Sequence, residues 1–165
     1  MSDAPLRRIY VAKAMAVLLP AALTFEGMRY VAYYDPPGVL TVCAGSTTDV
    51  EKGRRYTHEE CMSRLDADMM KAVRVVERCA PDLPLGPLIA FSDTVYNVGP
   101  IIVCDTKNST AARLLKAGDW RAACAQLPRW NKTTIGGKKV ELPGLTKRRA
   151  HALEVCLSNQ IEASR

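Results

Sequence analysis

The first stretch of the chain is an apolar run over residues 9–25. Its polar members are Tyr10, Lys13 and Thr24, and it contains one proline, Pro20. Such a run predicts a helix, and at about 1.5 Å per residue that helix would be about 25 Å long, just short of the hydrocarbon core of a bilayer. The pattern therefore predicts an apolar helix of marginal length for a membrane span.

Apolar residues with a different spacing follow Thr57. The segment from Thr57 to Glu60 has the sequence of a capping box, in which a Thr and a Glu three residues later satisfy the first backbone N–H groups of a helix. Apolar side chains then recur at helical intervals, at Cys61, Leu65, Met69, Ala72 or Val73, and Val76. These features predict a helix of about 22 residues up to Cys79, ended by Ala80-Pro81.

The rest of the chain is predicted to be mostly helical. Residues 39–42 are good strand formers and predict a short strand. Helices are predicted over residues 88–95, 110–117, 119–124 and about 146–158, with caps at Ser109 and Asp119 and a stop at Gly118. A turn is predicted over residues 97–100 and a glycine-bearing loop over residues 133–140. The long helix up to Cys79 would join a small N-terminal lobe to a larger helical one.

Composition and charge are those of a globular chain with a basic surface. The 165 residues suffice for one core or two small lobes, and 48% hydrophobic with 24% charged residues are ordinary values. The formal net charge of +6 favours a polyanionic partner, either nucleic acid or the anionic bacterial wall. Basic residues cluster only locally, at 138–139 and 147–149, and no recognised nucleic-acid reading module is present. We therefore expect no nucleic-acid partner.

Two acidic residues and a hydroxyl group follow the apolar run closely. Glycoside hydrolysis needs one carboxyl group that protonates the leaving oxygen and a second, ionised one that activates water or stabilises the transition state. Glu26 follows Leu23 and Phe25 at the end of the predicted apolar helix, where desolvation would keep it protonated. Asp35 precedes a Pro-Pro-Gly turn and should stay charged, and the hydroxyl group of Thr41 could hold the attacking water.

The residues around these three strengthen this interpretation. The pattern Glu26-x8-Asp35-x5-Thr41, set in Phe-Glu-Gly, Ala-Tyr-Tyr-Asp and Gly-Val-Leu-Thr-Val, closely resembles the catalytic signature of the phage-type lysozymes, the endolysins of tailed bacteriophages. Further resemblances follow in the family's order at Tyr56-Thr57 with Glu60-Cys61, residues 95–99, Ser109-Thr110, Arg129-Trp130, and Gly144-Leu145 with Arg148-Arg149. Together these motifs cover nearly the whole chain.

The resemblance implies an α+β, lysozyme-like fold that is mostly helical, with a small β-containing N-terminal lobe and a cleft between the lobes. It implies that Glu26 is the general acid, that Asp35 orients or activates water, and that Thr41 is the hydrogen-bonding partner of Asp35. The expected activity is inverting hydrolysis of the β-1,4 bond between N-acetylmuramic acid and N-acetylglucosamine in peptidoglycan, by a monomer without a cofactor. Ser46 departs from the family, which usually has a His there, and this puts a supporting ion pair in doubt.

Three interpretations compete for the apolar run. A cleavable signal peptide has the right composition, but no clean cleavage site is present, and cutting near Ala21-Ala22 would separate Glu26 from its helix. An ordinary core helix is the second interpretation. The third is a signal anchor that inserts weakly, because Lys13 makes insertion less favourable, and later leaves the membrane. This last interpretation resembles the signal-arrest-release endolysins of some phages.

A signal anchor would divide the chain into an anchor segment, residues 1–25, and a catalytic domain, residues 26–165. Arg7 and Arg8 would remain in the cytoplasm, so the catalytic domain would face the periplasm from the host inner membrane. While residues 9–25 are inserted, Glu26 would be held at the bilayer surface and the enzyme would be inactive. Release to the periplasm would activate it.

The chain contains six cysteines and no Cys-x-x-Cys pair. They are Cys43, Cys61, Cys79, Cys104, Cys124 and Cys156. With only two histidines, neither a zinc motif nor a catalytic metal site is expected. An exported protein would form disulfides and a cytosolic one would keep free thiols, and six cysteines allow fifteen pairings. The family resemblance implies the pairs Cys43 with Cys61, Cys79 with Cys104, and Cys124 with Cys156.

Two other functions fit parts of the same sequence. A lytic transglycosylase cuts the same bond with one acid and no catalytic water, and it leaves anhydro-sugar products. A non-catalytic membrane-active or wall-binding protein would need only the basic surface and the apolar N-terminal run.

Overall fold

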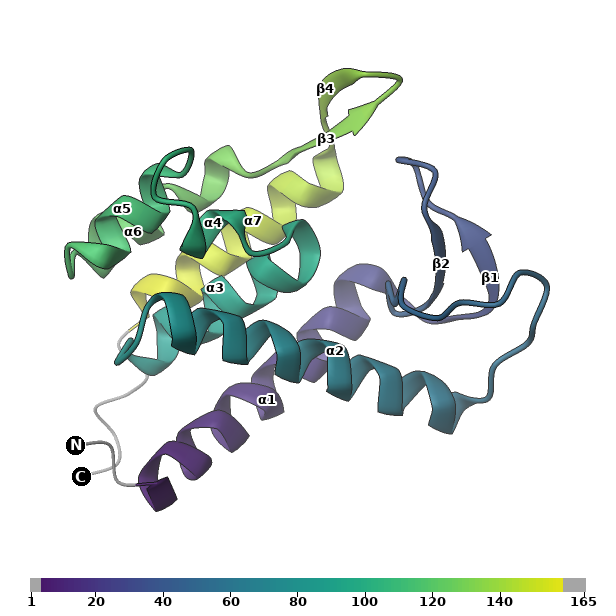
Figure 1. Ribbon diagram of the computed structural model, residues 1–165, viewed down its shortest axis with the longest axis horizontal. Helices are drawn as coiled ribbons and strands as arrows, with labels where there is room; N and C mark the ends of the chain where they lie inside the picture. Colours follow the sequence, from purple (N-terminus) through teal and green to yellow (C-terminus); the bar gives the residue numbers. More distant parts are fainter. Residues whose placement is uncertain (1–3, 159–165) are drawn as a thin grey trace.

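A long helix, α2 (His58–Cys79), connects a small β lobe to a larger helical lobe (Figure 1). The computed structural model describes residues 4–158. In the β lobe, β1 (Arg29–Tyr34) and β2 (Leu40–Cys43) pair as an antiparallel hairpin in which Tyr33 lies opposite Thr41. The predicted α+β architecture, with two lobes joined by a long helix, is confirmed.

The remaining elements form the helical lobe. They are α1 (Ala4–Glu26), α3 (Leu85–Val98), α4 (Ile101–Cys104), α5 (Thr110–Lys116), α6 (Trp120–Cys124), the short 3₁₀ helix η1 (Leu127–Arg129), β3 (Lys132–Ile135), β4 (Lys138–Glu141) and α7 (Pro143–Leu157). Figure 1 shows the β3–β4 hairpin projecting from the end of the helical lobe where α7 begins.

The helix α2 has the bounds and the cap that its sequence predicts. The Thr57 hydroxyl group accepts the N–H of Glu60 at 3.1 Å, and the Glu60 carboxylate accepts the N–H of Thr57 at 2.7 Å, so the capping box is complete. The predicted apolar stripe is buried along one face of α2, at Cys61, Leu65, Met69, Ala72, Val73 and Val76.

The first helix belongs to the same core as α2 and α3. Its buried side chains are Ala14, Met15, Leu18 and Ala22, which join the cluster formed by the apolar faces of the other helices. The helix predicted over residues 9–25 is confirmed, and α1 continues without a break across the boundary between residues 25 and 26.

Two predictions of local structure after residue 80 are wrong. Residues 132–141 form the β3–β4 hairpin, where a loop was predicted over residues 133–140. Gly136 and Gly137 make its turn with φ values of +55° and +77°, a geometry that suits a two-residue hairpin turn. Its strands are largely exposed and lack an apolar alternation, so their pattern carried no strand signal. The helix α3 extends beyond the predicted residues 88–95, and the predicted turn starts only at Gly99.

Three disulfides cross-link the fold, with the pairing that the family resemblance implied. Cys43 bonds to Cys61, Cys79 to Cys104, and Cys124 to Cys156. The first joins β2 to the start of α2, the second joins the end of α2 to α4, and the third joins α6 to α7.

Candidate active site

Glu26 is the last residue of α1, at the junction of the two lobes. Gly27 follows with a φ of +69° and donates its N–H to the carbonyl of Leu23 at 3.0 Å, which closes the helix. The chain then enters β1 almost at once. The Glu26 side chain is 24% exposed, so it is within reach of solvent while most of its surface is covered.

The Glu26 carboxylate is held by polar groups of α7 and α3. Its Oε1 accepts Nη1 of Arg148 and, at 3.4 Å, Nδ2 of Asn97. The ring of Phe25 lies 5.5 Å from the Arg148 guanidinium. The apolar surroundings predicted for Glu26 are therefore wrong: the sequence next to it is apolar, but packing of the helices brings a cation to its carboxylate.

Arg148 is buried and is fixed in turn by Asp93 of α3. Its Nε lies 3.2 and 3.0 Å from the two Asp93 oxygens, and its Nη2 lies 2.8 Å from Oδ1. Burial alone would lower the pKa of Arg148, but its hydrogen bonds to Asp93 and the charges of Asp93 and Glu26 together raise it. The guanidinium is therefore permanently charged.

Close packing of α3 on α7 makes these contacts possible. A Cβ atom at Gly86 of α3 would lie only 2.6 Å from the carbonyl oxygen of Val155 in α7, so no larger residue fits there. A second pair of contacts joins the same helices, because Arg149 donates to the Thr94 hydroxyl group at 2.7 Å and to Oδ1 of Asn97. Arg149 thus orients the amide that reaches Glu26.

Tyr96 of α3 connects Glu26 with the end of the β lobe. Its hydroxyl group donates to the carbonyl of Ala44. Burial and, secondarily, the charge of Glu26 raise the pKa of Tyr96, so this phenol stays protonated and remains a donor. A Cβ atom at the next residue, Gly45, would be 3.6 Å from both the Glu26 carboxyl carbon and the Tyr96 oxygen. The segment after β2 therefore lies directly against the carboxylate.

Asp35 and Thr41 are both tied to Val39 in the β1–β2 turn. Oδ1 of Asp35 accepts the Val39 N–H at 2.7 Å, and the hydroxyl group of Thr41 donates to the Val39 carbonyl at 3.0 Å. Asp35 is at the end of the strand, as predicted. The hydrogen bond predicted between Thr41 and Asp35 is replaced by this link through Val39, because the buried Thr41 hydroxyl group lies next to the turn backbone.

Tyr33 of β1 is a partly buried phenol in the β lobe. Burial raises the pKa of the Tyr33 hydroxyl group, the nearby Arg29 cation opposes this, and the charges of Glu26 and Asp35 both raise it further. The Arg29 guanidinium lies 4.2 Å from the centre of the Tyr33 ring.

Ser46, the departure from the family pattern, is buried. Its hydroxyl oxygen lies 3.5 Å from Nη1 of Arg64, which also donates to the carbonyl of Thr48 at 2.7 Å. The Ser46 hydroxyl group therefore has one hydrogen bond to an arginine of α2.

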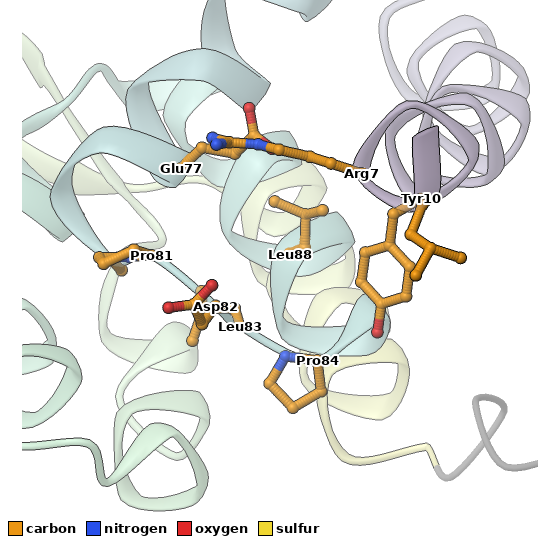
Figure 2. A pocket seen from close by; sticks show the side chains of 10 residues that line it. Arg7, Tyr10, Glu77, Pro81, Asp82, Leu83, Pro84 and Leu88 are labelled. Atoms are coloured by element: carbon orange, nitrogen blue, oxygen red, sulfur yellow. The ribbon is translucent and has the colours of Figure 1, made fainter. Parts of the chain in front are cut away.

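A hollow of about 620 Å³ lies away from these residues, between the start of α1 and the α2–α3 connection (Figure 2). Figure 2 shows Arg7 and Glu77 side by side along its edge, and their ion pair measures 2.9 Å. The hollow contains neither Glu26 nor Asp35. It is separate from the candidate active site.

Sequence reasoning missed the supports of Glu26. Arg148 and Asn97 stand in motifs that resemble the family, but they had no assigned role, and Asp93 was not singled out. A signal was present, because Asp93 is the single charged residue of the predicted helix over residues 88–95. A carboxylate buried in such a helix almost always has a cationic partner.

Comparison with known proteins agrees with this picture. The family model for phage lysozyme matches residues 23–152. The SAR-endolysin of Pseudomonas phage phiKMV is 36% identical over 145 residues, covering 87% of this chain and 88% of that protein. The SAR-endolysin of Enterobacteria phage PA-2 is 39% identical over 140 residues, covering 82% of this chain and 79% of that protein.

Solved structures show the same fold. The endolysin of the Escherichia coli O157:H7 phage FAHEc1 is 29% identical with a TM-score of 0.72, covering 85% of this chain and 90% of that one. The active form of the P1 phage endolysin Lyz gives a TM-score of 0.70 at 23% identity, covering 93% and 96% of the two chains. The secreted inactive form of Lyz gives a TM-score of 0.55 at 19% identity, covering 85% and 97%. Because the phage lysozyme family model matches most of this chain, the chain belongs to the phage lysozyme family of glycoside hydrolases.

Proposed function

We propose that this protein is a bacteriolytic endolysin that hydrolyses the β-1,4 bond between N-acetylmuramic acid and N-acetylglucosamine in peptidoglycan. The observation that carries the proposal is the placement of Glu26. It is fixed at the junction of the two lobes by Arg148 and Asn97, and the hairpin of β1 and β2 that carries Asp35 and Thr41 begins three residues further on, at Arg29. A pair of carboxyl groups in one region is what glycoside hydrolysis requires.

In this proposal Glu26 protonates the leaving oxygen and Asp35 activates the attacking water. Thr41 supports Asp35 through Val39, since both side chains are bonded to that residue. The family resemblance favours inversion, for which carboxyl groups are usually about 6.5 to 9.5 Å apart so that a water fits between substrate and base.

The decisive experiment is a digest of purified peptidoglycan by the soluble protein and by Glu26→Gln. The amide cannot donate a proton as an acid, so we expect the variant to be folded and inactive. Reducing-end products with intact sugars would support hydrolysis, whereas anhydro-sugars would indicate a lytic transglycosylase. Full activity of folded Glu26→Gln would refute the role of Glu26, and loss of wall turbidity without bond cleavage would indicate a non-catalytic wall-active protein.

We further propose that α1 is a membrane anchor before it becomes a core helix. Among the described residues, one helical segment, Leu6–Glu26, is long and apolar enough to cross a membrane by length and composition. A helix that only packs on a soluble core keeps a polar outer face. In α1 the outward side chains include Leu6, Ile9 and Val17, which are 64%, 53% and 42% exposed. Apolar residues on all sides suit a helix that must also be stable in lipid.

A cleavable signal peptide fits this arrangement poorly. Cleavage near Ala21-Ala22 would remove Ala14, Met15 and Leu18, which are buried in the core. It would also leave Glu26 without the helix that positions it. Retention of α1 is therefore part of the proposal, with Arg7 and Arg8 in the cytoplasm and the catalytic domain in the periplasm.

Activation follows from the position of Glu26 at the end of α1. While α1 lies in the bilayer, its buried stripe cannot pack on α2 and α3, and Glu26 cannot meet Arg148. The liposome-inserted protein should therefore leave added peptidoglycan intact, and equal rates for inserted and soluble protein would refute this control mechanism.

A further inference from the structure

Four charged side chains from three helices form a cluster that includes Glu26 of the candidate active site. They are Glu26 of α1, Asp93 of α3, and Arg148 and Arg149 of α7, and both arginines are buried. Asp93 lies at their centre, 2.8 Å from Nη2 of Arg148 and 3.6 Å from Nη1 of Arg149. With two carboxylates and two guanidinium groups, the cluster is neutral when all four groups are ionised.

Asp93 and Glu26 contact the Arg148 guanidinium to different extents. Asp93 has three close contacts with Arg148, two at Nε and one at Nη2, whereas Glu26 receives only Nη1. Arg149 is charged as well, although burial lowers its pKa to about 10. Asp93 is therefore the main counterion of a positively charged pair, and Glu26 is a partial one.

The charges around Glu26 matter because the proposed function requires Glu26 to donate a proton. A general acid must hold its proton until the leaving oxygen takes it. A guanidinium in contact with Glu26 favours loss of that proton, and a second negative charge nearby opposes the loss. The group on the described part of the chain that supplies this charge through direct contact with Arg148 is Asp93.

We propose that Asp93 is a positioning residue for the general acid. It fixes the Arg148 guanidinium so that Nη1 points at Glu26, and its negative charge offsets part of the positive charge that Arg148 places beside the Glu26 carboxyl group. Asp93 does not touch the reacting atoms, and it acts through Arg148. The inference rests on the proposed role of Glu26 as the acid.

Other groups around Glu26 must stay constant in a test. Arg148 of α7 and Asn97 of α3 contact its carboxylate, and Arg149 contacts Asn97. The charge of Glu26 also affects Tyr96 of α3 and Tyr33 of β1. On α2, Asp68 acts on Tyr96. Replacing Asp93 by Asn changes one charge and keeps the size of the side chain and one acceptor oxygen.

The test is the pH dependence of peptidoglycan hydrolysis by the full chain and by Asp93→Asn. Activity falls at high pH when the general acid loses its proton. In Asp93→Asn the charge of Arg148 is no longer offset, so we expect this alkaline limb to move to lower pH by about one unit, the usual size of the effect of a neighbouring charge. A loss of activity by the same factor at every pH, with the limb unmoved, would show that Asp93 is only structural and would overturn the proposal.

Two further variants keep the test decisive if Asp93→Asn folds poorly. Arg149→Gln removes a positive charge from the cluster, so the alkaline limb should move to higher pH. The double variant Asp93→Asn/Arg149→Gln restores neutrality, and its limb should return close to that of the unchanged protein. If Arg149→Gln leaves the limb in place or lowers its pH, the charge-balance argument is wrong. Asp66→Asn, the same change at an exposed residue of α2, should leave the profile unchanged.

Failure of this inference is distinguishable from failure of the proposed function. If the unchanged protein does not cleave peptidoglycan, or if Glu26→Gln remains active, the proposed function fails. If the unchanged protein is active, Glu26→Gln is inactive and Asp93→Asn has an unmoved alkaline limb, only the role of Asp93 is refuted.

Discussion

Val39 links the two functional candidates of the β lobe at the scale of single residues. Its N–H binds Oδ1 of Asp35, and its carbonyl accepts the hydroxyl group of Thr41. One oxygen of Asp35 therefore stabilises the turn through a hydrogen bond. The proposed chemical role depends instead on the negative charge of the carboxylate, so the two roles can be tested separately.

The substitution Asp35→Asn exploits this separation. An asparagine oxygen can still accept the Val39 N–H, so the turn should survive, while the charge that is proposed to activate water is lost. We expect the hydrolysis rate to fall by about 100- to 10,000-fold, the usual contribution of general acid–base catalysis, with little change in thermal stability. The measurements are product release from purified peptidoglycan and thermal unfolding by circular dichroism.

A matched control for this substitution lies in the same lobe. Asp49 is exposed, and Asn tolerates its positive φ of +49°. Asp49→Asn should therefore retain the activity of the unchanged protein. If Asp35→Asn were as active as this control, Asp35 would have no part in the chemistry.

At the scale of elements, the proposed anchor role would require α1 to be stable in two environments, the lipid bilayer and the protein core. Its buried stripe at Ala14, Leu18 and Ala22 packs on the core, while Lys13 on the opposite side is exposed. In a bilayer the same lysine makes insertion less favourable. A substitution of Lys13 should therefore change the stability of the membrane-inserted state and leave the packing of the folded protein unchanged.

Lys13→Leu should shift the balance towards the membrane. Removing a lysine from an inserted helix stabilises insertion by at most about 2.5 to 3.5 kcal/mol, and less near the membrane surface. We expect less protein in the soluble fraction after the membrane potential is dissipated, measured by fractionation of expressing cells. Lys13→Arg keeps the charge and should be released normally.

The purified soluble form of Lys13→Leu provides the second half of that test. Because Lys13 is exposed in the packed fold, the soluble variant should hydrolyse peptidoglycan at the unchanged rate. If Lys13→Leu is released as readily as Lys13→Arg, α1 does not act as a weakly inserted anchor.

At the scale of the whole molecule, three disulfides tie together the elements that build the site. Cys43–Cys61 holds the β lobe to α2, and Cys124–Cys156 holds α6 to α7, the helix that carries Arg148. These bonds span 18 and 32 residues of sequence. They restrict the unfolded chain and fix the ends of helices that lack other covalent links.

Removing the longest-range disulfide should lower the stability of the whole fold. For Cys124→Ala/Cys156→Ala we expect the free energy of unfolding to fall by about 3 to 4 kcal/mol, following the loop-entropy relation. Urea unfolding of the purified protein measures this. Cys43→Ala/Cys61→Ala removes a disulfide that closes a shorter loop, so it should lower the free energy of unfolding slightly less. A midpoint unchanged by the first double substitution would contradict the structural role of that bond.

Features encoded over a few residues were predictable, and α2 is the clearest example. Its capping box and apolar stripe fixed both ends, since the cap hydrogen bonds and the helical period involve residues three or four positions apart. The β3–β4 hairpin was missed because exposed strands need no apolar alternation, so only pairing across Gly136 and Gly137 defines them. Glu26 was correctly placed at a helix end, but its surroundings were not.

By itself, then, the amino-acid sequence determined the acid motif, the apolar N-terminal helix, the bounds of α2 and the family to which the chain belongs. Only the tertiary structure decided what surrounds Glu26. Arg148 is 122 positions from Glu26 and 55 from Asp93, and these groups meet because α1, α3 and α7 pack together. Contacts at such separations depend on the whole arrangement of helices, whereas helical periods and caps depend on neighbouring residues, and this is why the charge network appeared only in the folded protein.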